Sequence, residues 1–261
     1  MDIIKKYILK NRCYCQGRTI VPKGIIVHSI GTPQPDEDVI FNNFNKSSAT
    51  SAVHAIVGRN KIYQIMPWNY RSWGCGSGNN GSGNDTHIQF EICEPAGHKY
   101  LAGSTMIGYN KDKQQSYFDS VWANSVNLAA YLCEAYKLSP NTIICHSEAF
   151  KKGIASNHGD VMHWFPKHGK SMDDFRKAVA DKLNYVPPAP VDRNSSKEDI
   201  EWLQNKLNKA NKDYQIPITG VFDQKTRISL LMFADTKGWN WDNTWGFTAR
   251  QATINSLEKI K

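Results

Sequence analysis

Long hydrophobic runs are missing from this sequence of 261 residues. No segment reaches the roughly 18 consecutive apolar residues that indicate a membrane-spanning helix. The opening residues 1–7 contain neither the apolar core nor the small-residue cleavage site of a secretory signal peptide. We therefore expect a protein that is made in the cytoplasm, has no transmembrane segment and carries no export signal of its own.

Motifs for nucleic-acid binding are absent as well, although the chain is basic. Its net charge is +8 and its pI is near 9.1, which predicts an acidic partner. Nucleic acid and the anionic polymers of a cell wall are the two candidates, and the lack of an RNA- or DNA-binding motif favours the wall. A hydrophobic fraction of 40% is sufficient for a packed core.

Cysteine contributes six residues, and we expect free thiols because the protein is made in the cytoplasm. Cys13 and Cys15 are separated by one residue, which is too short a spacing for a usual zinc knuckle. Cys93 and Cys133 lie in apolar runs and are expected to be buried. The cysteines are therefore not expected to bind a metal ion.

Proline and polar residues dominate segment 184–197, which we interpret as a semi-rigid linker. The linker separates a domain formed by residues 1–183 from a smaller domain formed by residues 198–261. In the smaller domain, Ser196 is the expected N-cap of a first helix. Two aromatic turns then each lead into a further helix, so this domain should be mainly helical.

Periodicity predicts the main elements of the larger domain. Residues 116–136 and 173–183 have the apolar spacing of helices, and residues 52–66 read as a hairpin around a Gly-Arg-Asn turn. Residues 3–9 look like a short helical stretch. Glycine and asparagine dominate residues 74–84, which predicts a long loop.

Three separated residues are candidate zinc ligands. His28 and His146 each end a short apolar run that reads as a buried strand, and Asp160 lies in a polar loop. Three protein ligands leave a fourth zinc position for water, which is the arrangement of catalytic zinc sites. Glu91, on a strand pattern between them, is placed to exchange protons with that water.

Five segments, in this order and spacing, carry a family resemblance. They are Gly-Ile-Ile-Val-His-Ser (24–29), Ser-Ala-Val-His-Ala-Ile-Val (51–57), Ile-Tyr-Gln-Ile-Met-Pro (62–67), Ile-Gln-Phe-Glu-Ile-Cys (88–93) and Cys-His-Ser-Glu (145–148). Region 23–164 resembles the zinc-dependent N-acetylmuramoyl-L-alanine amidases, which share their fold with peptidoglycan recognition proteins. The resemblance implies an α/β fold with a central mixed β-sheet flanked by helices. It also implies a Zn²⁺ enzyme that hydrolyses the amide between N-acetylmuramic acid and L-alanine of bacterial peptidoglycan.

The resemblance assigns the ligands residue by residue. His28 and His146 match the first two family ligands. The third is Asp or Cys in a Lys-x-Asp or Lys-x-Cys segment before an aromatic residue, which matches His-Gly-Asp at 158–160. Asp160 is therefore the expected third ligand, and His163 is the alternative, because imidazole also suits zinc.

The other proposed catalytic residues come from the same matches. Glu91 matches the glutamate of the family segment Ile-Gly-Ile-Glu, with Gln89 in the place of the glycine. Its implied role is to take a proton from the attacking water and return it to the leaving amine. His158 takes the place of the family lysine that stabilises the oxyanion, and its imidazole could do the same. A loop histidine without a role is the alternative.

One family segment is altered in this chain. The family sequence Trp-His-Ala-Gly is here Trp-Gly-Cys-Gly at 73–76, so Gly74 replaces the histidine and its contribution to substrate binding is in doubt. Trp68 and Trp73 are expected to form a sugar-stacking wall, with burial in the core as the alternative. His54 is expected in the core or in support of a ligand.

Two further expectations concern the role of the C-terminal domain and the route by which the protein reaches the cell wall. Residues 202–204 and 219–226 resemble the small helical peptidoglycan-binding domain, although a helical appendage packed on the amidase is the alternative. A wall hydrolase without a signal resembles a phage endolysin, which reaches the wall after a partner holin opens the membrane. Peptidoglycan is then the expected partner.

Two other functions are alternatives to the amidase. A non-catalytic peptidoglycan recognition protein can share this fold, but such proteins typically lack a zinc ligand that is present here. A zinc peptidase acting on stem peptides would be expected to carry a His-Glu-x-x-His motif, which the sequence lacks. The amidase is therefore favoured.

Overall fold

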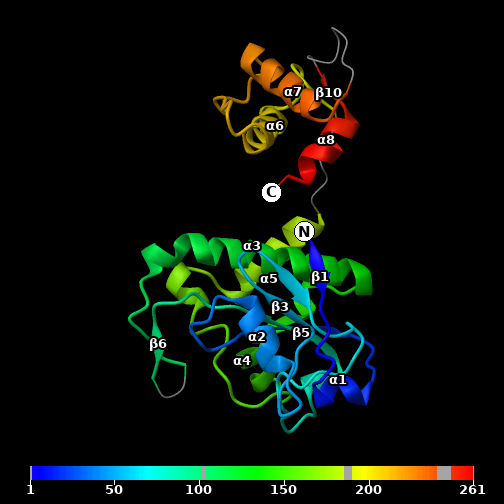
Figure 1. The fold of residues 1–261 in the computed structure, drawn as a ribbon, viewed down its shortest axis with the longest axis vertical. Helices are drawn as coiled ribbons and strands as arrows, with labels where there is room; N and C mark the ends of the chain where they lie inside the picture. The colour runs from blue at the N-terminus through cyan, green and yellow to red at the C-terminus, as the bar shows by residue number, and fades with distance from the viewer. Residues whose placement is uncertain (1, 102–103, 185–189, 240–247, 261) are drawn as a thin grey trace. The chain divides into compact units, whose positions relative to one another are not determined.

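The structure, a computed structural model, describes residues 2–101, 104–184, 190–239 and 248–260 (Figure 1). The chain forms two compact units, Met1–Asn184 and Tyr185–Lys261, and each has a hydrophobic core of its own. Within the described ranges, no helix has both the length and the apolar character needed to cross a membrane.

A six-stranded mixed sheet forms the centre of the first unit, in the order β1-β4-β3-β5-β2-β8. The pair β3–β4 is antiparallel and the other neighbours are parallel. The predicted α/β fold with a central mixed sheet is thus confirmed. The strands are β1 (Ile3–Lys5), β2 (Gly24–Ser29), β3 (Ala55–Val57), β4 (Ile62–Gln64), β5 (His87–Ile92) and β8 (Ile143–Cys145), with a separate antiparallel pair of β6 (Lys99–Tyr100) and β7 (Met106–Ile107).

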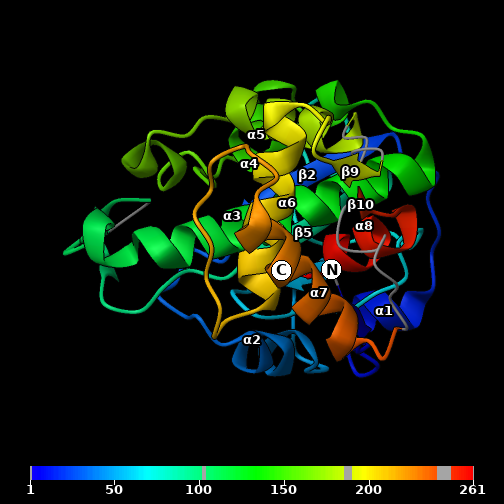
Figure 2. The same ribbon diagram turned by 90° about the horizontal axis from the view of Figure 1, so that it is seen from above.

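Helices flank this sheet. α3 and α5 lie together along one side of it in Figure 1, and Figure 2 places α2 and α4 on opposite flanks of the unit. The helices are α1 (Arg12–Gln16), α2 (Glu37–Phe44), α3 (Lys111–Tyr136), α4 (His146–Lys151) and α5 (Met172–Leu183), with 3-10 turns η1 (Gly83–Asp85), η2 (Pro140–Thr142) and η3 (Phe165–His168).

Strand alternation gives the sheet one mainly apolar face and one face with more polar groups. On β2, Ile25 and Val27 pack into the main core with residues of α3 and α5, whereas Ile26 belongs to a cluster on the opposite face. His28 shares the face of Ile26 because side chains two residues apart in a strand point the same way. Glu91 is the register partner of His28 on β5 and lies on this face too.

Most predicted elements of this unit are confirmed, but one is wrong. The predicted hairpin is β3 and β4, and α3 begins earlier than predicted, where the Asn110 side chain caps it. The stretch 3–9 is not helical, because Ile3–Lys5 pairs in parallel with β4 and extends the sheet. Pairing with a distant strand outweighed a weak local helix preference at this position.

The second unit is small and mainly helical, as predicted. Ser196 caps the first helix by accepting a hydrogen bond from the Asp199 backbone N–H. Its elements are α6 (Lys197–Ala210), α7 (Gln224–Thr236), α8 (Gln251–Glu258) and the antiparallel pair β9 (Val191–Asp192) and β10 (Thr248–Ala249).

The predicted linker 184–197 is too long. Val191 is 1% exposed and belongs to the core of the second unit, because its strand pairs with β10 and buries the side chain. Linker residues 185–189, and residues 240–247 with the first half of the second aromatic turn (244–251), lie outside the described residues.

Candidate metal centre

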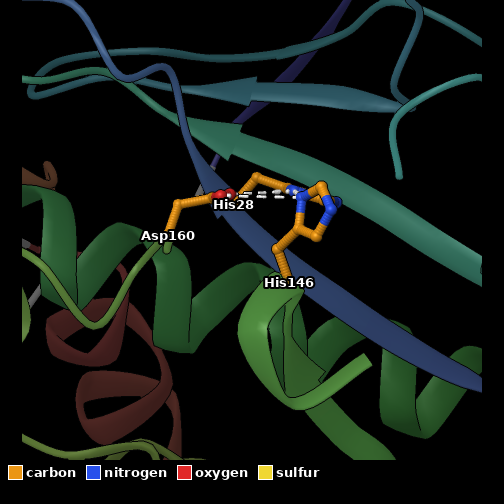
Figure 3. Close-up of side chains that lie close together, drawn as sticks. All are labelled: His28, His146 and Asp160. Atoms are coloured by element: carbon orange, nitrogen blue, oxygen red, sulfur yellow. Dashed lines mark hydrogen bonds and ion pairs between the residues drawn. The ribbon is translucent and has the colours of Figure 1, made fainter. Parts of the chain in front are cut away.

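Three elements bring His28, His146 and Asp160 together on the polar face of the sheet. His28 comes from the end of β2, His146 from the start of α4, and Asp160 from the loop after α4, and their side chains point toward one another in Figure 3. One ligand atom of each lies within 4.8 Å of the other two, and all three residues are buried. The three ligands predicted from the sequence are therefore brought into one group.

His146 differs in one respect from the prediction. It does not end a strand, because β8 stops at Cys145 and His146 is the first residue of α4. The Glu148 side chain accepts from the Cys145 backbone N–H at 3.1 Å and so helps the chain turn from strand to helix. The turn aims His146 at the end of the neighbouring strand β2.

Hydrogen bonds at the outer edges of the two rings determine which nitrogens face inward. The Nε2 of His146 lies 3.0 Å from the Ser156 carbonyl oxygen, which can only accept, so this nitrogen carries the proton. The Nε2 of His28 lies 2.9 Å from Gln89 Oε1. Both Nδ1 atoms then face the group, where they lie 3.2 Å apart.

The carboxylate of Asp160 completes the group. His28 Nδ1 lies 3.0 Å from Asp160 Oδ2, and His146 Nδ1 lies 3.5 Å from Asp160 Oδ1. Two inward nitrogen lone pairs at 3.2 Å repel each other unless a proton or a cation lies between them. Two imidazoles and one carboxylate form a donor set used by catalytic zinc, so the residues fit this ion.

The electrostatics of the group favour a cation. Burial raises the pKa of Asp160, but hydrogen bonds from His158 and His28 outweigh burial and hold this pKa well below its ordinary value. Burial and the nearby His28 lower the pKa of His146 to about 4. Burial lowers the pKa of His28, yet the hydrogen bond and charge of Asp160 raise it overall. Asp160 is therefore ionised, and a cation could replace the proton that His28 attracts.

Glu91 lies beside this group and opens onto a cavity. Its Oε2 is buried, and among the described residues none donates a hydrogen bond to it. Burial raises the pKa of Glu91 to about 7, against the opposing charge of His28. The cavity has a volume of about 420 Å³ and is lined by α2 and the following loop, including Asn43 and Ser51. Glu91 is thus a carboxyl group that can exchange a proton near neutral pH with a molecule in the cavity.

His158 lies at the outer side of the group. Its side chain is 56% exposed, its Nδ1 contacts Asp160 Oδ1, and its ring stacks on His146 with the centroids 5.2 Å apart. The hydrogen bond to Asp160 raises the pKa of His158. Because Nδ1 is engaged with Asp160, only Nε2 could reach an oxyanion.

His163, the alternative third ligand, is directed elsewhere. Its Nε2 lies 2.7 Å from the Tyr100 hydroxyl and 3.3 Å from Glu94 Oε1. Glu94 also accepts from Tyr100 at 2.6 Å and from the Gly31 backbone N–H at 3.1 Å. His163 therefore joins a buried network around Glu94, away from the His28–His146–Asp160 group.

The two predicted sugar-stacking residues do not form one wall. Trp68 is 8% exposed and stacks on the buried His54, with the ring centroids 6.4 Å apart. This low exposure favours the alternative for Trp68, burial in the core. Trp73 is half-buried and lines a second cavity of about 410 Å³ together with Arg12, Cys15 and Gln16, so its role stays a prediction.

Sequence reasoning missed two residues that orient the histidines. Gln89 and Ser156 accept from the outer ring nitrogens of His28 and His146. Gln89 carried a signal, since it stands where the family segment has glycine, but Ser156 acts through its backbone and no side-chain pattern could reveal it. His54, predicted in the core or in support of a ligand, is fully buried and bonds Tyr70 and Gln89.

Comparisons with known proteins identify the family of this chain. The profile of the family described as N-acetylmuramoyl-L-alanine amidase, Amidase_2, matches residues 16–163. The N-acetylmuramoyl-L-alanine amidase XlyA of Bacillus subtilis is 25% identical over 184 residues, which cover 68% of this chain and 59% of XlyA. CwlH, an amidase of the same name and organism, is 35% identical over 82 residues, which cover 31% of this chain and 33% of CwlH.

The fold is shared with a solved structure. The Staphylococcus aureus hydrolase AmiA, determined in complex with its ligand, superposes with a TM-score of 0.54 at 22% identity, covering 70% of this chain and 83% of that one. The alignments with XlyA and CwlH cover 59% and 33% of those two proteins, so this chain matches less than two-thirds of either one. The family profile, in contrast, covers more than half of this chain and includes His28, Glu91, His146 and Asp160. The chain belongs to the Amidase_2 family of N-acetylmuramoyl-L-alanine amidases.

Proposed function

We propose that this protein is a zinc-dependent amidase that cleaves the bond between N-acetylmuramic acid and L-alanine in peptidoglycan. The convergence of His28 Nδ1, His146 Nδ1 and Asp160 beside the buried carboxyl group of Glu91 is the observation that carries the proposal. His28, His146 and Asp160 would hold the ion. A zinc ion bound there would polarise a water molecule and the substrate carbonyl.

The residues of the chain supply the proton transfers. Glu91 accepts a proton from the attacking water and returns it to the leaving amine of L-alanine. Burial raises the pKa of Glu91 above that of an ordinary glutamate, which favours the return of the proton to the amine. His158, held beside Asp160, stabilises the negative charge that develops on the carbonyl oxygen.

The cavity next to Glu91 provides room for the substrate. Its lining combines apolar side chains of Ile30, Ile40 and Phe44 with hydroxyl and amide groups. Such a mixed lining suits a peptide attached to a sugar, which offers both apolar and hydrogen-bonding groups. The stem peptide and lactyl group are therefore assigned to this cavity.

The proposal extends to the biological setting. The protein acts as an endolysin of phage or prophage type, and reaches the wall after a holin opens the membrane. The second unit, with its own core around Leu203, Leu230 and Phe233, serves as a wall-binding domain. Its partners are peptidoglycan and, through the net charge of +8, anionic wall polymers.

Digestion of purified bacterial walls tests the proposed reaction. The wild-type protein should contain one zinc ion and should release new alanine amino groups without new reducing sugar ends. New amino groups on other residues would indicate a stem-peptide peptidase, and binding without cleavage would indicate a recognition protein. Either result, or reducing ends, would overturn the proposed activity.

A further inference from the structure

Gln89 forms the connection between a backbone loop and the first ligand of the candidate metal centre. It lies on β5 with its side chain fully buried, on the same face as His28 and Glu91. Its Oε1 lies 2.9 Å from His28 Nε2, and its Nε2 lies 2.9 Å from Asn84 Oδ1. Both ends of the amide are therefore engaged.

The backbone N–H groups of Gly74 and Cys75 determine the orientation of this amide through the side chain of Asn84. The Oδ1 of Asn84 accepts from the backbone N–H groups of Gly74 at 2.9 Å and Cys75 at 3.2 Å, so it must be the oxygen of that side chain. Gln89 must then direct its NH₂ group at Asn84 and its Oε1 at His28. His28 in turn must carry a proton on Nε2, which makes Nδ1 the nitrogen that faces Asp160 and His146 and is available to an ion.

Gly74 makes room for this arrangement. A Cβ atom at position 74 would lie 2.4 Å from Gln89 Oε1 and 2.9 Å from a methyl group of Val53. Contacts this short cannot be relieved without moving the amide, because Val53 is buried in the core behind it. Any side chain at 74 would therefore displace Gln89 from His28.

These are the two positions where the chain differs from the family segments in a reciprocal way. The segments have histidine at 74 and glycine at 89, whereas this chain has Gly74 and Gln89. This chain thus has the smaller residue at position 74 and the larger residue at position 89. We propose that Gln89 is a positioning residue of the metal centre, which fixes His28 with its Nδ1 toward the ion, and that Gly74 is its steric counterpart.

This inference rests on the proposed zinc function, and zinc affinity of the full-length protein tests it. In Gln89→Met the length of the side chain is kept, but its hydrogen bonds to His28, Asn84 and Cys75 are lost. The expected loss of zinc affinity is about 10- to 100-fold, the usual effect of removing a group that orients a ligand. Gln89→Glu keeps an acceptor toward His28 and should bind zinc more tightly than Gln89→Met. Competition with a chromophoric chelator measures both.

Gln64→Met is the matched control. Gln64 is also a buried glutamine of the same sheet, but its amide donates to the Met66 carbonyl and does not contact the metal centre. Its zinc affinity should equal that of the wild type. A second readout needs no metal: nitrogen NMR of the metal-free protein should show the Nε2 of His28 protonated in the wild type and in Gln64→Met, and at least partly unprotonated in Gln89→Met.

A pair of size changes tests the steric part. Gly74→Ala should weaken zinc binding in the wild type but cause no further loss in a Gln89→Gly background, so the two effects should not add. The inference is overturned if Gln89→Met keeps wild-type zinc affinity and a fully protonated His28 Nε2 while the wild type binds zinc and cleaves walls. A wild type without zinc would overturn the proposed function as well, so the two failures can be told apart.

Discussion

Replacing Glu91 by glutamine should make the metal-free protein more stable at alkaline pH. The carboxyl group has a pKa of about 7 in the folded protein, against 4.5 for an ordinary glutamate, because it is buried. A raised pKa means that the folded state binds the proton more tightly than the unfolded state. Glu91 therefore contributes stability below about pH 4.5 that is lost progressively as the pH rises through 7.

The magnitude follows from the two pKa values. Each pKa unit corresponds to about 1.4 kcal/mol, so ionising Glu91 costs the folded state about 3 kcal/mol once the pH is well above 7. Glutamine cannot ionise and avoids this cost. Between pH 5 and pH 8.5 the advantage of Glu91→Gln over the wild type should grow by about 2 to 3 kcal/mol. Comparing the two pH values cancels any constant effect of the substitution on packing.

Denaturant unfolding of both proteins in the presence of a chelator measures this difference. Glu134→Gln, which removes an exposed carboxylate from α3, is the control for a change in net charge, and its effect should not grow with pH. The same Glu91→Gln protein, loaded with zinc, should lose turnover by about 10² to 10⁴, as expected for a missing general base. A Glu91→Gln variant whose advantage is the same at both pH values would refute the assignment of a carboxyl group whose Oε2 is buried without a hydrogen-bond donor among the described residues.

The remaining predictions concern the ligands and the two units. His28→Ala or His146→Ala should abolish both zinc binding and wall lysis, because two remaining ligands hold the ion poorly; full zinc content in either variant would show that the site is wrong. Asp160→Ala should lower zinc affinity sharply and His163→Ala should do little to it, since His163 bonds Tyr100 and Glu94; a metal titration with the reverse ranking would make His163 the ligand. A fragment of residues 1–184 should cleave small muramyl peptides at near the full rate but digest intact walls less well, because a tethered binding unit raises the local enzyme concentration. Equal wall lysis by fragment and full chain, together with failure of fragment 190–261 to sediment with walls, would remove the wall-binding role.

The elements predicted correctly are those whose pattern is local. The helix α3 follows from apolar residues at a helical period, and the β3–β4 hairpin follows from two apolar runs around a Gly-Arg-Asn turn. The errors occur where a distant partner decides the conformation. Ile3–Lys5 is a strand because β4 offers a free edge, and Val191 is buried because β10 lies beside it. Neither partner can be recognised from the neighbouring residues in the sequence.

The site residues also depend on partners that are distant in the sequence. His28 is 118 residues from His146 and 132 residues from Asp160 in the chain, so no local pattern links them, and the family segments were needed to select them among eight histidines. An aromatic residue near a site can equally well belong to the core, and the 8% exposure of Trp68 favours that alternative.

The identity of a ligand and the identity of its ligand atom depend on different parts of the sequence. Residue type and motif position select His28 and His146, but the choice of Nδ1 over Nε2 is made by the acceptors behind each ring. One of these is the Ser156 carbonyl, a group that every residue carries. The other is Gln89, whose amide orientation depends in turn on the backbone of Gly74 through Asn84. Two chains with the same ligands could therefore differ in zinc affinity by the factor of about 10 to 100 that an orienting group controls, and the difference would lie at positions that no ligand motif includes.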